Sequence, residues 1–457
     1  MKRSASLAAA LAVSLAVSLA ASVLVSSAAS AHDRAEGPRA VRGLYGTKAP
    51  YAPQQSASRY QPVPNGFTAV FTENVARHGS RAMTDSGDGD AVLAVLQRAQ
   101  EQNALTGLGT RLAPQVRALL SAAAGLGYGN LSGRGVQEER GIAERMEQRE
   151  PRLFRTIAAG REPIEVETSG VARAVASARA FTAGLAAADP AVGGLIRDPV
   201  TDKDLLYFHK QPQNADYQAY LSGDPQLAAV LGQINDAPRT ASTAGHVVSR
   251  LFRADFAASM SADDRIAFAR SLYQLFSAAP DLAVEAPSVD LGPFLTRADA
   301  QWFAYLDDAE EFYQKGPAFA GRTITYKMAD GLLDDLLARA EAKAAGTSST
   351  GAVLRFTHAE EIEPLAALLG LPGSTRPAPP GTPYTYATNP WRGARVAPMA
   401  ANIQWDLYAN TPQEGKPARF LVRMVYNEKE AAFKPACEPI AKGSYFYDLT
   451  TLRNCLK

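Results

Sequence analysis

The sequence predicts an α/β fold: a mostly parallel sheet with helices on both faces, plus an inserted, mainly helical cap subdomain. Two observations predict this fold. Short apolar runs followed by helical patterns recur at distant positions, which is typical of strand–helix units in a largely parallel sheet. Between these units, residues 200–345 have helical spacing, are rich in aromatic residues and show no strand alternation.

The N-terminus has the pattern of an export signal. Lys2 and Arg3 precede a run of Ala, Leu, Val and Ser, and the small residues 29-ASA-31 form a cleavage site. A membrane anchor is the alternative, but the run is Ser-rich and ends in small residues, which favours cleavage after Ala31. No later stretch is long enough to span a bilayer. We therefore expect a secreted protein whose residues 32–66, rich in Pro, Gly and Ala, form an extended leader on the surface.

The elements of the α/β body are expected in residues 67–199 and 346–457, on either side of the cap at 200–345. The expected strands are 67–71, 163–169, 400–409, 418–427 and the start of 351–362, whose second half is helical. Helical patterns cover 90–103, 109–124, 135–150 and 170–187. The glycine-rich stretch 125–135 lacks a preceding strand and is interpreted as a turn rather than a nucleotide-binding loop.

Composition excludes some partners. The chain has 457 residues, of which 20% are charged, and its formal net charge is +1, so nothing in it favours nucleic acid or an anionic membrane as partner. Cys437 and Cys455 are the two cysteines, and in an oxidising compartment such an isolated pair favours a disulfide over a metal site. The sequence leaves the oligomeric state open, and a monomer is the default expectation.

The stretch 74-NVARHGSRAM-83 carries the first candidate site. Its histidine, His78, lies between Arg77 and Arg81 directly after an apolar run. A neutral imidazole is a good nucleophile toward phosphorus, and guanidinium groups match the geometry and charge of a phosphate. Nearby cations also lower an imidazole pKa, which keeps the nucleophile neutral. Any one of these residues alone would be a surface charge or a buried polar group; the combination after a strand predicts a phosphoryl-transfer site.

Two further clusters occupy equivalent positions. Arg173 opens the helical stretch after the strand at 163–169, and His358 and Glu360 follow the strand in 351–362. Ligands bind beyond the carboxyl ends of parallel strands, so we expect all three clusters to meet there. A histidine can donate to a phosphate oxygen, and a nearby carboxylic acid can protonate a leaving alkoxide. The alternative is that Arg173 is a solvated helix charge and Glu360 a residue that complements the helix dipole.

Taken together, these residues resemble the histidine acid phosphatases, branch two of the histidine phosphatase superfamily. The motif 358-HAE-360 is similar to that of the multiple inositol polyphosphate phosphatases, and 131-LSGRG-135, 173-RAVASARAF-181 and 421-LVRMVYNEKE-430 extend the resemblance over most of the mature chain. The resemblance implies an α/β body with a helical cap. It also implies that the C-terminal cysteines pair.

The resemblance also implies roles for the site residues. His78 would form a phosphohistidine, and Glu360 would donate the proton to the leaving group. The scissile phosphate would be bound by Arg77, Arg81, Arg173 and His358. No metal or cofactor is implied, and the substrate would be a small phosphate ester such as an inositol polyphosphate (phytate).

Three functions remain open from the sequence. The first is a secreted phosphatase of inositol polyphosphates, and the second is a broad-specificity acid phosphatase with the same chemistry. The third is an exported phosphate-ester binding protein without turnover; a protein of that kind would be expected to lose His78 or Glu360, and this chain keeps both. Lys203, Lys210, Arg250 and Arg253 are candidates to bind further phosphates. His209 and His246 lack an acidic neighbour at ligand spacing and are expected to be structural or exposed.

Overall fold

The structure is a computed structural model that describes residues 42–412 and 417–457. The predicted export signal, residues 1–31, lies outside the described residues. Within those ranges no helix is both long and apolar enough to cross a bilayer. Residues 42–66 lie along the body, where Ala49 O accepts from Met399 N and the hydroxyl of Tyr60 donates to Glu428 O.

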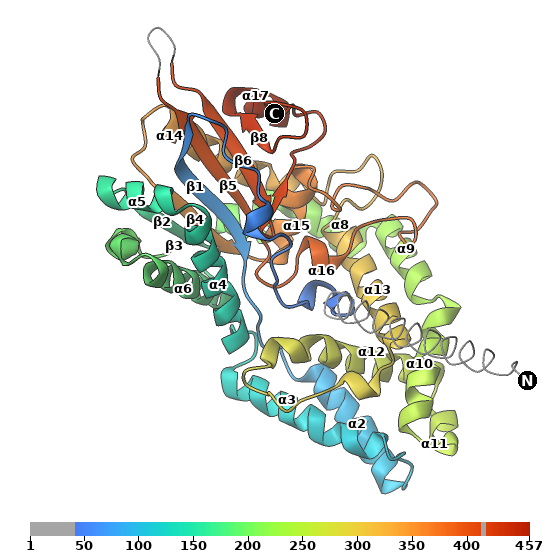
Figure 1. Cartoon of the computed structure of the whole chain (residues 1–457). Helices are drawn as coiled ribbons and strands as arrows, with labels where there is room; N and C mark the ends of the chain where they lie inside the picture. Colours follow the sequence, from blue (N-terminus) through green and yellow to red (C-terminus); the bar gives the residue numbers. More distant parts are fainter. Residues whose placement is uncertain (1–41, 413–416) are drawn as a thin grey trace, which may run out of the picture.

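One mixed sheet organises the body (Figure 1). Its order is β3-β2-β4-β1-β5-β6-β7, with β8 also paired to β6. The strands are β1 (Phe67–Arg77), β2 (Ile164–Thr168), β3 (Val200–Thr201), β4 (Ala352–Thr357), β5 (Asn402–Asn410), β6 (Phe420–Tyr426), β7 (Lys429–Ala431) and β8 (Phe446–Asp448).

The predicted α/β architecture is confirmed, with one difference in strand direction. The β3, β2, β4 and β1 strands are parallel, whereas β5 to β8 pair antiparallel. Connection length explains the direction of β6: a parallel neighbour needs a long crossover, whereas β6 follows β5 after a short link and must run back beside it.

Helices cover both faces of the sheet. The first face carries α4 (Gly133–Arg149), α5 (Pro151–Gly160) and α6 (Ala172–Ala188); the second carries α14 (Asp330–Ala344) and α15 (Ala359–Leu368). Successive strand residues enter different cores, as a two-residue period requires: Val75 and Val353 pack on the second face, Ala76 and Leu354 on the first.

A helical layer lies beyond the strand ends (Figure 1). It contains α7 (Lys203–Leu206), α8 (Ala215–Gly223), α9 (Pro225–Asn235), α10 (Pro238–Leu251), α11 (Ala254–Ser259), α12 (Ala262–Ala278) and α13 (Arg297–Gln314). The helices α2 (Gly87–Glu101) and α3 (Leu112–Leu126) join it, because α2 packs against α12 and Val92, Leu96 and Val116 share one core with Phe252 and Phe268.

The C-terminal segment is cross-linked by a disulfide bond. The short helix α16 (Gly393–Val396) precedes β5, and α17 (Leu449–Leu456) follows β8. Cys437 and Cys455 form the disulfide that the sequence predicts. The bond joins the segment before β8 to α17.

Candidate active site

The nucleophile candidate is held at the end of β1. His78 N donates to Thr357 O at the end of β4 (2.9 Å), and His78 O accepts from Ala400 N (3.0 Å). Its ring Nδ1 lies 2.9 Å from Gly79 O. A carbonyl oxygen can only accept, so Nδ1 carries the proton and the neutral ring keeps its lone pair on Nε2. The backbone therefore selects the tautomer that a nucleophilic Nε2 needs.

The surroundings keep His78 neutral. The residue is 2% exposed. Burial, and then the charge of Arg77, the His358 ring and the charges of Arg81 and Arg173, hold the pKa of His78 well below its usual value. Each of these effects disfavours the imidazolium. The ring is therefore available as a nucleophile even in mildly acidic solution.

The three arginines lack carboxylate partners. Arg77 Nη1 donates to Thr47 O and Ala397 O, both at 2.6 Å, and Arg81 Nη1 donates to Ala82 O (2.8 Å). Among the described residues, no carboxylate comes within ion-pair distance of Arg77, Arg81 or Arg173. The Nε atoms of all three are buried without a hydrogen-bond partner.

Crowding of like charge is visible at Arg81. Burial, followed by the charges of Arg173 and Arg77, lowers the pKa of Arg81 to about 10. Buried charges normally have a partner of opposite sign. Three clustered guanidinium groups with no carboxylate at ion-pair distance in the described ranges are suited to bind an anion, and their planar donors match the geometry of a phosphate.

His358, after β4, contacts residues that follow β2 and lies close to His78 at the end of β1. It caps α15 after β4, and its ring lies 5.4 Å from the His78 ring, centroid to centroid. Arg173 Nη2 is 3.2 Å from His358 Nδ1, and Ser169 Oγ is 2.9 Å from His358 Nε2. Because arginine can only donate, Nδ1 is the acceptor and Nε2–H donates to Ser169. Burial, then Arg173, lowers the pKa of His358 to about 3.

Glu360 lies in the first turn of α15, next to a lysine from the helical layer. Its Oε1 is 3.2 Å from Lys315 Nζ, and its side chain is 30% exposed. Burial alone would raise the pKa of Glu360, but the charge of Lys315 outweighs it and the pKa lies well below the ordinary value. In the substrate-free protein Glu360 is thus a carboxylate, which can accept a proton at once but must gain one before it can donate.

The segment 131-LSGRG-135, predicted to be a turn, contains the N-cap Ser132 and the start of α4, and it packs against residues 78–82 after β1, here called the nucleophile loop. Ser132 N and Oγ both donate to Ser80 O, at 2.9 and 3.0 Å. Gly135 packs so closely that a Cβ there would lie 2.2 Å from Ser80 O. Gly79 N donates to Ser177 Oγ (3.1 Å), so the face of α6 that carries Arg173 also holds this loop.

The structure thus brings together all six predicted site residues: Arg77, His78, Arg81, Arg173, His358 and Glu360. It also shows where two other histidines lie: His209 is buried, and the side chain of His246 is half-exposed. His209 Nδ1 bonds Glu361 Oε1 (2.6 Å) and His246 Nδ1 bonds Asp299 Oδ1 (2.9 Å), so both have acidic partners. These pairs are distant in sequence, 152 residues apart for His209, and local spacing cannot reveal them.

Two acidic residues that were not identified from the sequence hold the loop after His78 through Ser80. Ser80 N donates to Glu138 Oε2 (2.8 Å), and Ser80 Oγ bonds Asp281 Oδ1 (2.9 Å). Arg250, a candidate for extra phosphates, instead donates to the carbonyls of Pro293 and Phe294. In the described part of the chain, no group of three or more His, Cys, Asp or Glu residues is arranged to hold a metal ion.

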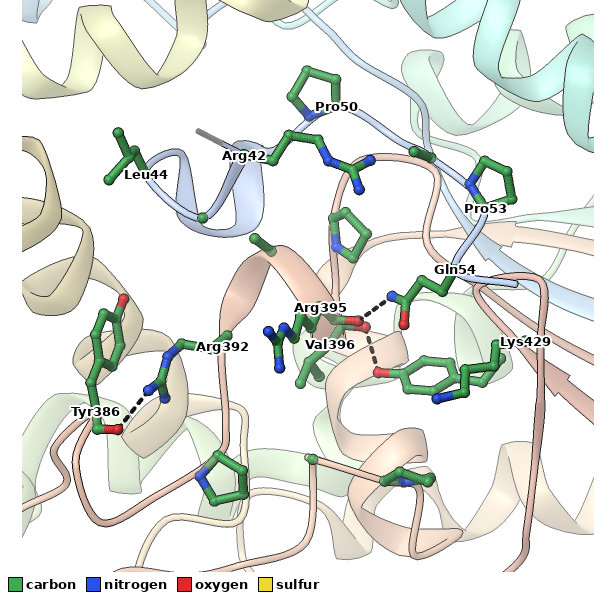
Figure 2. Close-up of a pocket in the computed structure, with 18 of the residues that line it drawn as sticks. Arg42, Leu44, Pro50, Pro53, Gln54, Tyr386, Arg392, Arg395, Val396 and Lys429 are labelled. Atoms are coloured by element: carbon green, nitrogen blue, oxygen red, sulfur yellow. Dashed lines mark hydrogen bonds between the residues drawn. The ribbon is translucent and has the colours of Figure 1, made fainter. Parts of the chain in front are cut away.

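A cavity of about 920 Å³, shown in Figure 2, has none of the six site residues among those that line it. Its walls come from segments 42–54, 386–398 and 429–431, joined by bonds such as Gln54 Nε2 to Arg395 O (3.0 Å). Thr47 and Ala397, whose carbonyls hold Arg77, belong to two of these segments. The segments that line the cavity therefore also contribute the two carbonyl groups that hold Arg77, although neither Thr47 nor Ala397 lines the cavity itself.

Comparison with known proteins agrees with this geometry. A neutral histidine facing clustered arginines, at the carboxyl ends of parallel strands, defines a phosphoryl-transfer site. The family pattern of the histidine phosphatase superfamily (branch 2) matches residues 71–427, and the chain belongs to this family. It is a hydrolytic phosphatase.

Particular relatives are also similar. The apo structure of a multiple inositol polyphosphate phosphatase from Bifidobacterium longum is 33% identical with a TM-score of 0.85, covering 91% of this chain and 97% of that one. The same relative was solved with inositol hexasulfate (TM-score 0.83). Multiple inositol polyphosphate phosphatase 1 of Gallus gallus is 24% identical over 71% of this chain and 70% of its own.

Proposed function

We propose that this protein is a secreted phosphomonoesterase that hydrolyses inositol polyphosphates through a phosphohistidine intermediate. The observation that carries the chemistry is a neutral His78 with Nε2 unprotonated, among three arginines that lack carboxylate partners in the described ranges. Support for the substrate class comes from the names of the relatives and from the inositol hexasulfate bound to one of them.

In the first step, His78 Nε2 attacks the phosphorus and the P–O bond to the leaving oxygen breaks. Arg77, Arg81 and Arg173 stabilise charge on the phosphoryl oxygens, which is the main work in phosphoryl transfer. Glu360, protonated in the substrate complex, gives its proton to the leaving oxygen. Negative phosphates of the substrate favour that protonation because they raise a neighbouring carboxyl pKa.

His358 needs a change of tautomer to bind the phosphate. Both ring nitrogens are engaged in the substrate-free arrangement, with Nδ1 accepting from Arg173. When Arg173 turns to the phosphate, Ser169 O–H can donate to Nε2 and leave Nδ1–H to donate to a phosphoryl oxygen. A hydroxyl can act as donor or acceptor, so Ser169 serves both states.

In the second step, the Glu360 carboxylate takes a proton from a water molecule, and the resulting hydroxide attacks the phosphorus. The P–N bond breaks, and inorganic phosphate and neutral His78 are released. Glu360 is then protonated for the next leaving group, which is the alternation expected of one carboxyl serving as acid and base.

The same proposal covers the organisation of the chain. The body is 67–199 with 346–457, and residues 200–345 supply the cap that brings Lys315 and His209 to Glu360 and Glu361, apart from β3 and α14, which belong to the sheet and its second face. Export depends on cleavage after Ala31; N-terminal sequencing of protein from the culture medium should start at residue 32, and a start at Met1 would contradict it.

The activity is tested with purified protein on inositol hexakisphosphate and on p-nitrophenyl phosphate, with and without a chelator. We expect hydrolysis of both, faster for the first, and no effect of the chelator. His78→Ala should lower kcat by at least about 10⁴-fold. His246→Ala is the matched control, because this half-exposed histidine lies on α10, and its activity should stay close to wild type.

Each other outcome has a definite meaning. Equal rates on both esters would indicate a broad-specificity acid phosphatase. Tight binding of inositol hexasulfate, with no hydrolysis of either phosphate ester, would indicate a binding protein. Chelator-sensitive activity would contradict a metal-free mechanism. Wild-type turnover by His78→Ala would remove His78 from its role, as would failure to trap an acid-labile, alkali-stable phosphoenzyme by rapid quenching.

A further inference from the structure

The end of helix α13 lies directly against the proposed proton donor. Lys315 caps this helix, and its Nζ is 3.2 Å from Glu360 Oε1 and 2.7 Å from Glu311 Oε2. The Lys315 side chain is only 14% exposed. One partly buried ammonium group is therefore shared between a carboxylate of the site and a carboxylate of its own helix.

The lysine is held in place by the turn that follows it. Lys315 N and Gly316 N both donate to Glu311 O, at 2.8 and 3.2 Å, and Thr325 Oγ1 donates to Gly316 O (2.7 Å). A Cβ on residue 316 would lie 2.8 Å from Phe312 O. Close packing of this kind fixes the backbone from which Lys315 reaches Glu360, so the contact is a built feature of the fold.

Charged and titratable groups surround Glu360 from every element packed around it. They are Lys315 and Glu311 of α13, Glu361 and Glu363 of α15, His358 at its cap, His209 of the 3-10 turn Phe208–Lys210, Tyr217 of α8, Arg173 of α6, and Arg81 of the nucleophile loop. Of the cations, Lys315 alone is within ion-pair distance of Glu360 among the described residues.

We propose that Lys315 is a positioning residue for the acid–base step. It holds the Glu360 carboxylate toward the site and sets the pH range in which Glu360 carries a proton. Glu311 competes with Glu360 for the same ammonium group. This inference rests on the proposed function and adds residues of the cap to it. It makes the cap a determinant of the pH dependence of leaving-group protonation.

Lys315 and Glu311 act on the pKa of Glu360 in opposite directions. Burial lowers the pKa of Lys315, but the charges of Glu311, Glu360 and Glu363 raise it well above its usual value, so the ammonium stays charged. Loss of Lys315 removes the cation that lowers the pKa of Glu360. Loss of the Glu311 charge removes a nearby anion and leaves the ammonium to Glu360, which lowers that pKa further.

The test compares pH profiles of the single-turnover rate at saturating substrate for Lys315→Met, Glu311→Gln and wild type, because this rate reports protonation in the substrate complex whereas kcat/KM reports the free enzyme. The substrate is glycerol 2-phosphate, whose alkoxide leaving group needs a proton. We expect the alkaline limb to move to higher pH in Lys315→Met, by about one to three pH units, and to lower pH in Glu311→Gln. With p-nitrophenyl phosphate, whose leaving group needs no proton, neither variant should move the limb.

Matched variants separate this role from a structural one. Lys343→Met removes a similar ion pair, to Glu162 (2.8 Å), before the start of β2 and away from the strand ends that form the site, and should leave the limb unchanged. Lys315→Arg keeps the charge and should restore the wild-type limb. If Lys315→Met does not fold, the opposite shift in Glu311→Gln still distinguishes a positioning role from a structural one, because a purely structural role lowers the rate without moving the alkaline limb.

Two results would overturn the proposal. One is an unmoved limb in folded variants, and the other is an equal shift on both esters, which would place the effect outside leaving-group protonation. These results differ from failure of the proposed function. If wild-type protein hydrolyses neither ester, the proposed function fails and this inference fails with it.

Discussion

Close packing between Gly135 and the nucleophile loop leads to a quantitative prediction for Gly135→Ala. A Cβ at this position would lie 2.2 Å from Ser80 O, whereas such contacts are essentially never below 3.0 Å. The loop must therefore shift by at least 3.0 − 2.2 = 0.8 Å. Ser80 lies two residues from His78, and a displacement of about 1 Å can lower a rate by about 10²-fold, or roughly 2.7 kcal/mol of transition-state stabilisation.

The assay is kcat/KM on p-nitrophenyl phosphate, with thermal unfolding measured on the same sample. Gly141→Ala is the matched control in the same helix, because its Cβ would meet only the flexible end of Arg145. Alanine in a helix interior should stabilise it slightly, by about 0.5–1 kcal/mol, with activity unchanged. Wild-type kcat/KM in folded Gly135→Ala would refute the view that this contact positions His78.

Three more predictions concern stability. Replacing both Cys437 and Cys455 with serine should lower the free energy of unfolding, measured with urea, by about 3 kcal/mol, because the bond closes a loop of 18 residues. Unfolded, unreduced wild-type protein should show no free thiol. Arg355→Met should cost about 3–5 kcal/mol by leaving buried Glu73, its partner at 2.9 Å, unpaired; a loss below about 1 kcal/mol would contradict this. In the folded protein the pKa of His358 is lowered to about 3, so at pH values between about 6.5 and 3 the unfolded chain binds one more proton. The free energy of unfolding should therefore fall as the pH drops through this range. His358→Gln should reduce the slope of that fall by about one proton, and an unchanged slope would contradict the prediction.

Much of the fold and site followed from local pattern. The strand of residues 352–357 and the helix after it could be predicted because apolar runs and helical spacing are properties of neighbouring residues. Arg77, His78 and Arg81 form one contiguous motif. Arg173 and His358 were predicted from their positions after strands, because parallel strands bring their carboxyl ends to one edge of a sheet.

The remaining features depend on contacts between distant segments. The antiparallel pairing of β5 with β1 joins two segments that are far apart in the sequence. The partner of His209, Glu361, lies on another element and could not be identified from local spacing. The protonation state of Glu360 was not predictable either, because an acidic residue in a first helical turn has the same local sequence whether or not a lysine lies beside it.

By itself, the sequence determined the order of strands and helices and the side chains that follow each strand, including a histidine between two arginines. The two arginines beside His78 already predict that its ring is neutral, but only the tertiary structure decided the charge states of the other side chains: His358 is neutral, and Glu360 is ionised beside Lys315. The physical reason is that a charge state depends on burial and on distances of a few ångströms to other charges, and the folded chain sets those distances between residues that are far apart in sequence.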